Sequence, residues 1–147
     1  MKKMVLGLVL LMILAVVSLA SAQTVNVWYP VEKAQWKIMA WDAPLLTDGD
    51  PLPDPADAAL SYNIYVKNAN TQAVILIGTG ITALQQEIVL PKRARYFAGV
   101  EANLLYTGET VPMKSPIAWS TDSVVCKDGQ TFGLRFQTGP KEPKELR

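Results

Sequence analysis

The sequence predicts an all-β domain of the sandwich or barrel type. Three observations lead to this prediction. No stretch of useful length repeats its apolar residues with the period of a helix, whereas short apolar runs recur between residues that favour turns. The chain has 147 residues, a length that suits one domain. It also contains 9 glycines and 10 prolines, which separate the apolar runs.

Residues 1–22 predict a secretory signal peptide. Lys2 and Lys3 precede an almost wholly apolar run, Met4–Leu19, and the small residues that follow predict cleavage before Gln23. An uncleaved anchor is the alternative, which the length of the run disfavours because a spanning helix needs roughly 20 apolar residues. We therefore expect a protein that is exported to the periplasm, the cell surface or the medium. After cleavage of the signal, we expect no stable membrane span.

Short β-rich runs follow one another through the rest of the chain. Strands are predicted over residues 24–29, 34–41, 60–67, 73–77, 84–90, 95–103 and 115–120. The first is expected to stop at Pro30, because proline cannot donate to a sheet ladder. Alternation is clearest in the third and sixth runs, where every second residue is apolar and one face is expected to be buried. The predicted structural core consists of Trp41, Tyr62, Ile64, Leu90, Tyr96 and Val100.

A loop rich in aspartate and proline is predicted between the second and third of these strands, over residues 45–59. Its acids invite a calcium interpretation, because calcium prefers several carboxylate oxygens. The spacing of Asp48, Asp50, Asp54 and Asp57 does not fit the loop of an EF-hand. A solvated acidic loop is the favoured interpretation, and whether it binds calcium stays open.

The C-terminal part predicts a β-hairpin extension over residues 122–137, followed by a disordered tail over 138–147. Asp128-Gly129 carries the hairpin prediction, because both central residues of the tight turn must accept a positive φ angle. Such an extension can extend a sheet, cover its own sheet edge or pair with another chain. The tail is polar and contains prolines.

Composition excludes several classes of function. The chain has no histidine, which removes the commonest general base, and its net charge of +1 gives no basic surface for nucleic acid. No cofactor is expected. Cys126 is the single cysteine, so it can form a disulfide between two chains or react as a free thiol. The favoured interpretation is that it lies buried and inert in a strand. A catalytic carboxylate pair such as Asp42 with Glu101 is disfavoured, because the acids are scattered, and we expect no enzyme.

The order of these motifs resembles a fibronectin type III domain over residues 23–121. Ile38–Pro44 resembles the second strand of that family, with its tryptophan and proline-marked turn, and Tyr62–Tyr65 resembles the third strand. Leu90-Pro91 followed by Tyr96 resembles the spacing of the tyrosine corner. The resemblance implies an immunoglobulin-like sandwich in which Trp41 fills the space between two sheets. It also implies that Tyr96 ties a crossover loop by one hydrogen bond.

Two functions are weighed from the sequence. The first is an exported, non-catalytic module with a structural, adhesive or protein-binding role in the envelope or outside the cell, which can also assemble with itself through sheet edges. The second is a module that binds carbohydrate or another cell-surface polymer by stacking sugars on exposed aromatic rings. The candidate ligand-facing aromatics are Trp28, Tyr29, Tyr106 and Trp119.

Overall fold

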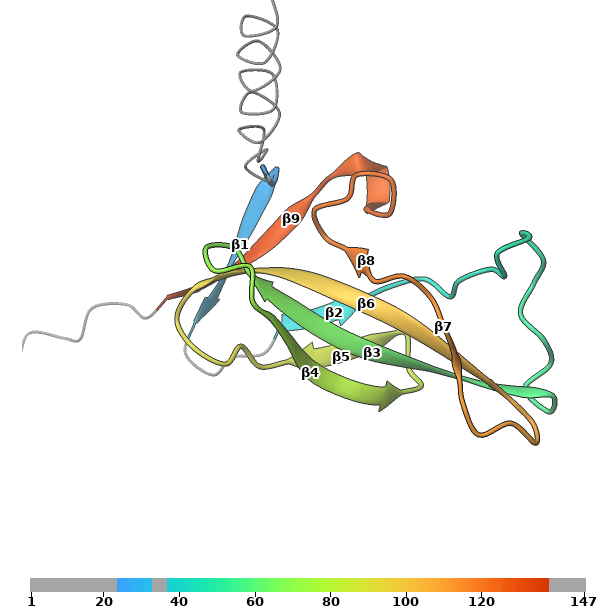
Figure 1. Cartoon of the computed structure of the whole chain (residues 1–147). Helices are drawn as coiled ribbons and strands as arrows, with labels where there is room; N and C mark the ends of the chain where they lie inside the picture. Colours follow the sequence, from blue (N-terminus) through green and yellow to red (C-terminus); the bar gives the residue numbers. More distant parts are fainter. Residues whose placement is uncertain (1–23, 33–36, 138–147) are drawn as a thin grey trace, which may run out of the picture.

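The structure, a computed structural model, describes residues 24–32 and 37–137 and confirms the all-β prediction (Figure 1). The predictions of a signal peptide over 1–22 and of a disordered tail over 138–147 lie outside the described residues. Among the described residues, no helix is long and apolar enough to cross a bilayer.

The described residues form β-strands and one short 3₁₀ helix, η1 (Lys127–Gly129). The strands are β1 (Val27–Glu32), β2 (Lys37–Ala40), β3 (Ala58–Asn68), β4 (Val74–Ile81), β5 (Gln85–Ile88), β6 (Arg95–Tyr106), β7 (Met113–Lys114), β8 (Ala118–Trp119) and β9 (Phe132–Gln137). Figure 1 shows that β3 and β6 run along the length of the molecule, with β1 and β9 at one end.

The strands form one seven-stranded sheet and one two-stranded sheet. The large sheet has the order β1-β9-β6-β3-β4. β3 pairs with β6 along its whole length, so β7, β8 and β9 share the other edge of β6 in three short pieces. β1 pairs with β9 in parallel, which makes the sheet mixed. β2 and β5 form the second sheet as an antiparallel pair.

The hydrophobic core draws side chains from both sheets. Its buried members are Val31, Ile64, Val66, Ile88, Leu90, Tyr96, Ala98 and Leu134. We call the face of the large sheet that carries Ile64 and Val66 the inner face, and the opposite face the outer face. Of the predicted core residues, four are buried, whereas Trp41 and Val100 are half-buried and pack against the cluster. The Trp41 ring meets the Tyr62 ring edge to face, with their centroids 5.3 Å apart.

Tyr96 makes the hydrogen bond that is expected of a corner tyrosine. Its side chain is fully buried at the start of β6, and its hydroxyl donates to the carbonyl oxygen of Lys92 at 3.0 Å. This bond ties the segment between β5 and β6 to the core.

The predicted hairpin over residues 122–137 is wrong. Asp128 and Gly129 do have positive φ angles of 55° and 68°, but they lie in η1 and not between two strands. Only β9 forms a strand, and its two edges are occupied by β1 and β6. β9 is therefore an internal strand of the large sheet. β1 and β6 pair with its two edges, so neither edge is open to a hairpin partner.

The first strand also differs from its prediction. It covers Val27–Glu32 and so continues through Pro30, where the sequence predicts a stop. Within residues 24–32 and 37–137, β1 lies at an edge of the large sheet and pairs with β9 alone. Because an edge strand turns half of its N–H groups away from its neighbour, a proline there can be accommodated without the loss of a ladder bond.

Candidate functional site

The outer face of the large sheet carries a row of aromatic and cationic side chains. Trp28 of β1 lies flat on Gly133 of β9, so closely that a Cβ atom at Gly133 would be 2.5 Å from the indole ring. The guanidinium of Arg95 lies over the same indole, 5.2 Å from its centre. Trp28 is therefore enclosed between glycine backbone and a cation, an arrangement that a cation–π attraction stabilises.

Trp119 of β8 repeats this arrangement on β6. A Cβ atom at Gly99 would be 2.7 Å from the indole of Trp119, and the ammonium of Lys67 lies 4.6 Å from the centre of its ring. Phe97 lies between the two tryptophans: its ring centre is 5.8 Å from that of Trp28 and 5.7 Å from the Lys67 ammonium. Each indole thus lies against glycine backbone and has a cation near its ring.

The four aromatics that were candidates for ligand contact do not share one surface. Trp28 and Trp119 lie on the outer face, whereas Tyr29 is directed to the opposite side of β1 and meets Phe132 edge to face at 6.0 Å. Tyr29 is 43% exposed. Tyr106 is half-buried at the far end of β6. The structure therefore brings two of the four onto one face, where each has glycine backbone and a cation beside its ring.

A polar network occupies the outer face beside the aromatic row. The buried carboxylate of Glu101 accepts hydrogen bonds from the side-chain amide of Asn63 at 2.9 Å and from the hydroxyl of Tyr65 at 3.0 Å. The ammonium of Lys114 lies 3.5 Å away. Burial by itself would raise the pKa of Glu101, but the two hydrogen bonds and the lysine charge outweigh it and lower that pKa.

The large sheet lies between Asp42 and Glu101, the two carboxylates of the disfavoured catalytic pair. Glu101 lies on the outer face, among Asn63, Tyr65 and Lys114. Asp42 follows β2, which belongs to the sheet on the inner side, and it is exposed. The two carboxylates therefore lie on opposite sides of the large sheet and share no site.

The aspartates of the acidic loop bond to their own backbone. Asp48 accepts a hydrogen bond from the N–H of Asp50 at 3.1 Å, and Asp54 accepts one from the N–H of Ala56 at 2.9 Å. Such bonds stabilise tight turns in a proline-rich segment. Across the described ranges, no group of three or more acidic, cysteine or histidine side chains could hold a metal ion.

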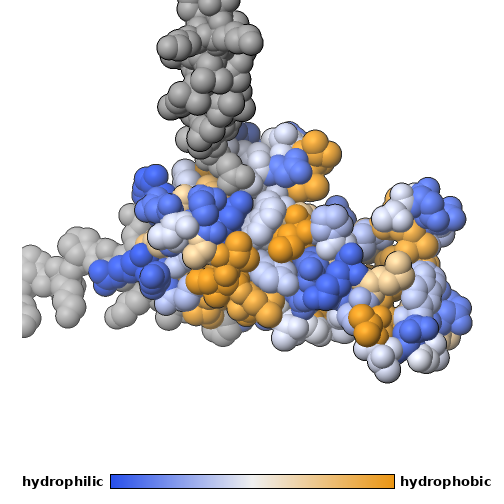
Figure 2. Space-filling model, in the orientation of Figure 1, coloured by the Kyte–Doolittle hydropathy of each residue, from blue (hydrophilic) through white to orange (hydrophobic). Residues whose placement is uncertain are grey.

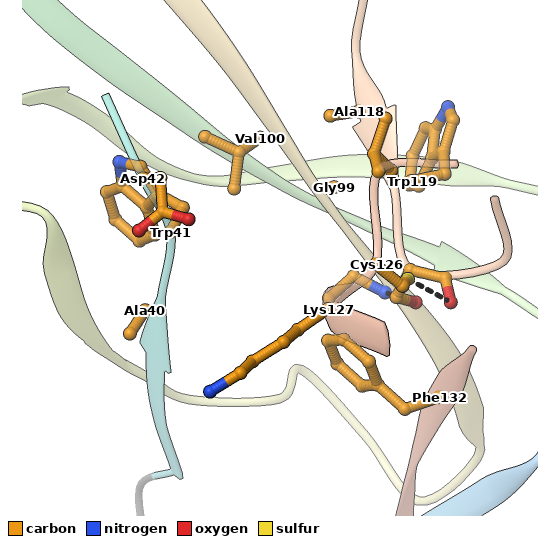
Figure 3. Close-up of a pocket in the computed structure, with 13 residues that line it drawn as sticks. Ala40, Trp41, Asp42, Gly99, Val100, Ala118, Trp119, Cys126, Lys127 and Phe132 are labelled. Atoms are coloured by element: carbon orange, nitrogen blue, oxygen red, sulfur yellow. Dashed lines mark hydrogen bonds between the residues drawn. The ribbon is translucent and has the colours of Figure 1, made fainter. Parts of the chain in front are cut away.

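A cavity of about 490 Å³ opens between the end of β2 and the region around β6, β8 and η1 (Figure 3). Its wall includes Trp41, Val100, Trp119 and Phe132, and the side chain of Lys127 extends across it towards β2. The wall is mainly apolar, and among the described residues the indole N–H of Trp41 has no hydrogen-bond partner.

Burial raises the pKa of two groups in or beside this cavity. The Cys126 thiol donates a hydrogen bond to the carbonyl oxygen of Ser120 at 3.3 Å, and burial together with the charge of Asp122 raises its pKa. Cys126 is half-buried and precedes η1, so the expectation that it lies in a strand is wrong. Burial also raises the pKa of Tyr62, whose hydroxyl has no hydrogen-bond partner among the described residues.

The exposed apolar surface consists mainly of aliphatic residues. Its large members are Tyr29, Leu45, Val74, Leu76, Leu84, Val89, Val111, Met113, Val124 and Val125. Val74 and Leu76 lie on the same face of β4, two residues apart, and each is about half exposed. Figure 2 shows apolar surface over the beginning of β4, with polar residues around it.

Sequence reasoning missed the outer face as an organised surface. The two glycines that seat the tryptophans lie inside strands, where glycine often marks a close approach of another group. Gly99 and Gly133 therefore indicate a close approach of another group to the backbone, but the sequence does not indicate which ring approaches which glycine. Phe97 and Glu101 alternate with the predicted inner residues of β6, and both are buried on the outer face.

Comparison of the chain with protein-family models, with curated proteins and with solved structures finds no match.

Proposed function

We propose that this chain is an exported, non-catalytic β-sandwich module of the fibronectin type III kind. Its role is structural, adhesive or protein-binding, in the cell envelope or outside the cell. Export is inferred from residues 1–22, whose charged start, apolar run and small residues are typical of a signal peptide.

The strand order supports the sandwich assignment. In immunoglobulin-like domains, the third, sixth and seventh strands are neighbours in one sheet, and the second and fifth strands pair in the other. β3, β6 and β9 are neighbours here, and β2 pairs with β5. The Tyr96 hydroxyl bonded to Lys92 is a further feature of that family.

One observation favours protein as the partner over carbohydrate. A sugar ring stacks on an open aromatic face, but Trp28 and Trp119 each lie on glycine backbone and carry a cation over the ring. The exposed apolar residues are largely aliphatic, such as Val74 and Leu76. Aliphatic side chains of this kind bury well against another protein, because the free energy of association scales with the apolar area removed from water.

Carbohydrate binding remains the alternative function. It can be tested by removing the Lys67 side chain, whose ammonium lies over the ring of Trp119. Tryptophan fluorescence would be titrated with soluble polysaccharides of several classes, for the wild-type chain and for Lys67→Ala, which uncovers one face of Trp119. We expect no saturable change in the wild type. A saturable change that is lost in Trp119→Ala would overturn the preference for a protein partner.

The protein-binding role is tested by cross-linking in the cells that make the chain. A photoreactive amino acid would replace Leu76, which is apolar and 51% exposed, and the control would place it at the exposed, polar Asp54. We expect discrete cross-linked proteins from position 76 in the exported fraction, and fewer from position 54. Recovery of the chain in the cytoplasm, or equal labelling from both positions, would contradict the proposal.

A further inference from the structure

We infer that the free edge of β4 pairs with the β4 edge of a second copy of this chain, antiparallel and across a two-fold axis at Ile75. This inference rests on the protein-binding function and names the partner. It is carried by the direction of the backbone groups of β4, by the apolar side chains at that edge, and by the contrast with the opposite edge of the same sheet.

The hydrogen bonds between β3 and β4 fix which residues of β4 face the free edge. The N–H of Asn68 donates to the carbonyl of Ala73 at 2.9 Å, so these two residues form a hydrogen-bonded pair. Alternate residues of an antiparallel strand turn their backbone groups to opposite sides. Val74 and Leu76, which oppose Lys67 and Tyr65, therefore turn their N–H and C=O groups away from β3.

The same two residues carry the exposed apolar side chains of the strand. Val74 is 50% exposed and Leu76 is 51% exposed, and both lie on the outer face. β4 holds no charged residue and no proline, the two devices that most often protect a sheet edge from pairing. The neighbouring cation on this face, Lys67, lies over Phe97 and Trp119 and so leans away from the edge.

The opposite edge of the large sheet is protected. β1 contains Pro30, which cannot donate a hydrogen bond, and ends at Glu32. Since β7 and β8 have only two residues each, the described part of each copy offers one long open edge from this sheet. Two such edges close on each other as an isologous pair and leave none for a third copy. The two strands of the second sheet each contain a charged residue, Lys37 in β2 and Glu87 in β5, which disfavours pairing at their edges.

A two-fold axis at Ile75 satisfies both the backbone and the side chains. Val74 of one copy then opposes Leu76 of the other, twice, and each pair exchanges two N–H···O=C bonds. The four apolar side chains meet on the outer face, and no charges oppose each other. The ladder ends where Gln72 adopts a positive φ angle of 59° and where the register shifts at Gly78, so we expect a small interface and a reversible dimer.

The first test is the mass of the chain purified from cells that express the full-length sequence. Light scattering over about a hundredfold range of concentration should show a change from one chain to two. Leu76→Lys should weaken the dimer at least about tenfold, because it places two desolvated charges at the edge. Val111→Lys is the matched control, since it adds the same charge at a residue that is 75% exposed and lies outside any strand.

The second test concerns the register and uses a background with Cys126→Ser. A mixture of Val74→Cys and Leu76→Cys chains should form disulfide-linked pairs, because the Cα atoms of a hydrogen-bonded pair lie about 5.5 Å apart. Either variant alone should cross-link much less, because its cysteines are diagonal neighbours at roughly 7–8 Å. Efficient cross-linking of one variant with itself would overturn this register.

The outcomes separate the inference from the function on which it rests. A wild-type chain that stays at the mass of one copy throughout the range overturns self-pairing, as does a dimer that Leu76→Lys leaves intact. If such a monomer still cross-links from position 76 to a different protein, the protein-binding function stands and the partner is not a second copy. Circular dichroism of Leu76→Lys should match the wild type, which excludes unfolding as the cause of a lost dimer.

Discussion

Gly133 gives the sharpest test of how the outer face is built. The nearest atoms to a Cβ at this position all belong to the Trp28 ring, at 2.5, 2.7 and 3.0 Å. No positive φ angle is involved at Gly133, so alanine can adopt its backbone conformation without strain. The substitution Gly133→Ala therefore isolates one effect, the steric conflict between an added methyl group and the indole.

Two opposing contributions set the expected magnitude. Overpacking against a ring that must shift costs about 1–3 kcal/mol. Replacement of glycine by alanine restricts the unfolded chain and returns about 0.4–1 kcal/mol. We therefore expect Gly133→Ala to lower the free energy of unfolding by about 1–2 kcal/mol, the difference of these two contributions. In a Trp28→Ala background the conflict is absent, and the same substitution should raise that free energy by about 0.5 kcal/mol.

The assay is urea unfolding followed by far-UV circular dichroism for the four members of the double-mutant cycle. The change of sign is the decisive result, and it gives a coupling energy of about 2 kcal/mol between positions 28 and 133. Gly80→Ala is the control. Its φ angle is +67° and it has open space around it, so its cost comes from the backbone alone and should be equal in both backgrounds.

Equal effects of Gly133→Ala in the presence and in the absence of Trp28 would refute the reasoning. So would a stabilising effect in the wild-type background. Either result would mean that the indole does not lie on Gly133. Trp28 would then have an open face on which a sugar could stack.

Three further predictions concern stability and reactivity. Tyr96→Phe should lower the free energy of unfolding by about 1–2 kcal/mol in urea titrations, because the carbonyl of Lys92 loses its hydrogen bond; an unchanged midpoint would show that the corner bond contributes nothing. Glu101→Gln should cost about 1 kcal/mol at neutral pH. Because the folded pKa of Glu101 lies below its ordinary value of 4.5, this difference should be constant above that pH and shrink as the pH falls further, and a difference that grows in acid would contradict it. Cys126 should react with a maleimide more slowly in the folded chain than in urea, since burial raises its pKa, and equal rates would argue against the half-buried site.

Local patterns were sufficient to predict most strands and, for β3 and β6, one buried face. The alternation in β3 predicted that Tyr62, Ile64 and Val66 point the same way, and all three are buried. Tyr96 was expected in a corner and is found bonded to Lys92. These predictions succeed because the side-chain period of a strand is two, so a few consecutive residues already define its buried face.

The candidate site was predicted less well. The sequence identified Trp28 and Trp119 as aromatic residues near strand ends, but it could not show that each would be enclosed by a glycine and a cation. The partners are distant in the chain: Trp28 meets Gly133 and Arg95, and Trp119 meets Gly99 and Lys67. The availability of an aromatic face is decided by such neighbours and not by the residue itself.

What the sequence by itself determined is the all-β class, the apolar and polar faces of β3 and β6, and the leader-like start of the chain. Only the tertiary structure decided that β9 inserts between β1 and β6, that two indoles are covered, and that β4 is left as an open edge. The physical reason is that the pleat is a property of consecutive residues. Strand neighbours, in contrast, are chosen by contacts between segments that are separate in the chain, and the most distant such pair joins Val27 to Phe132.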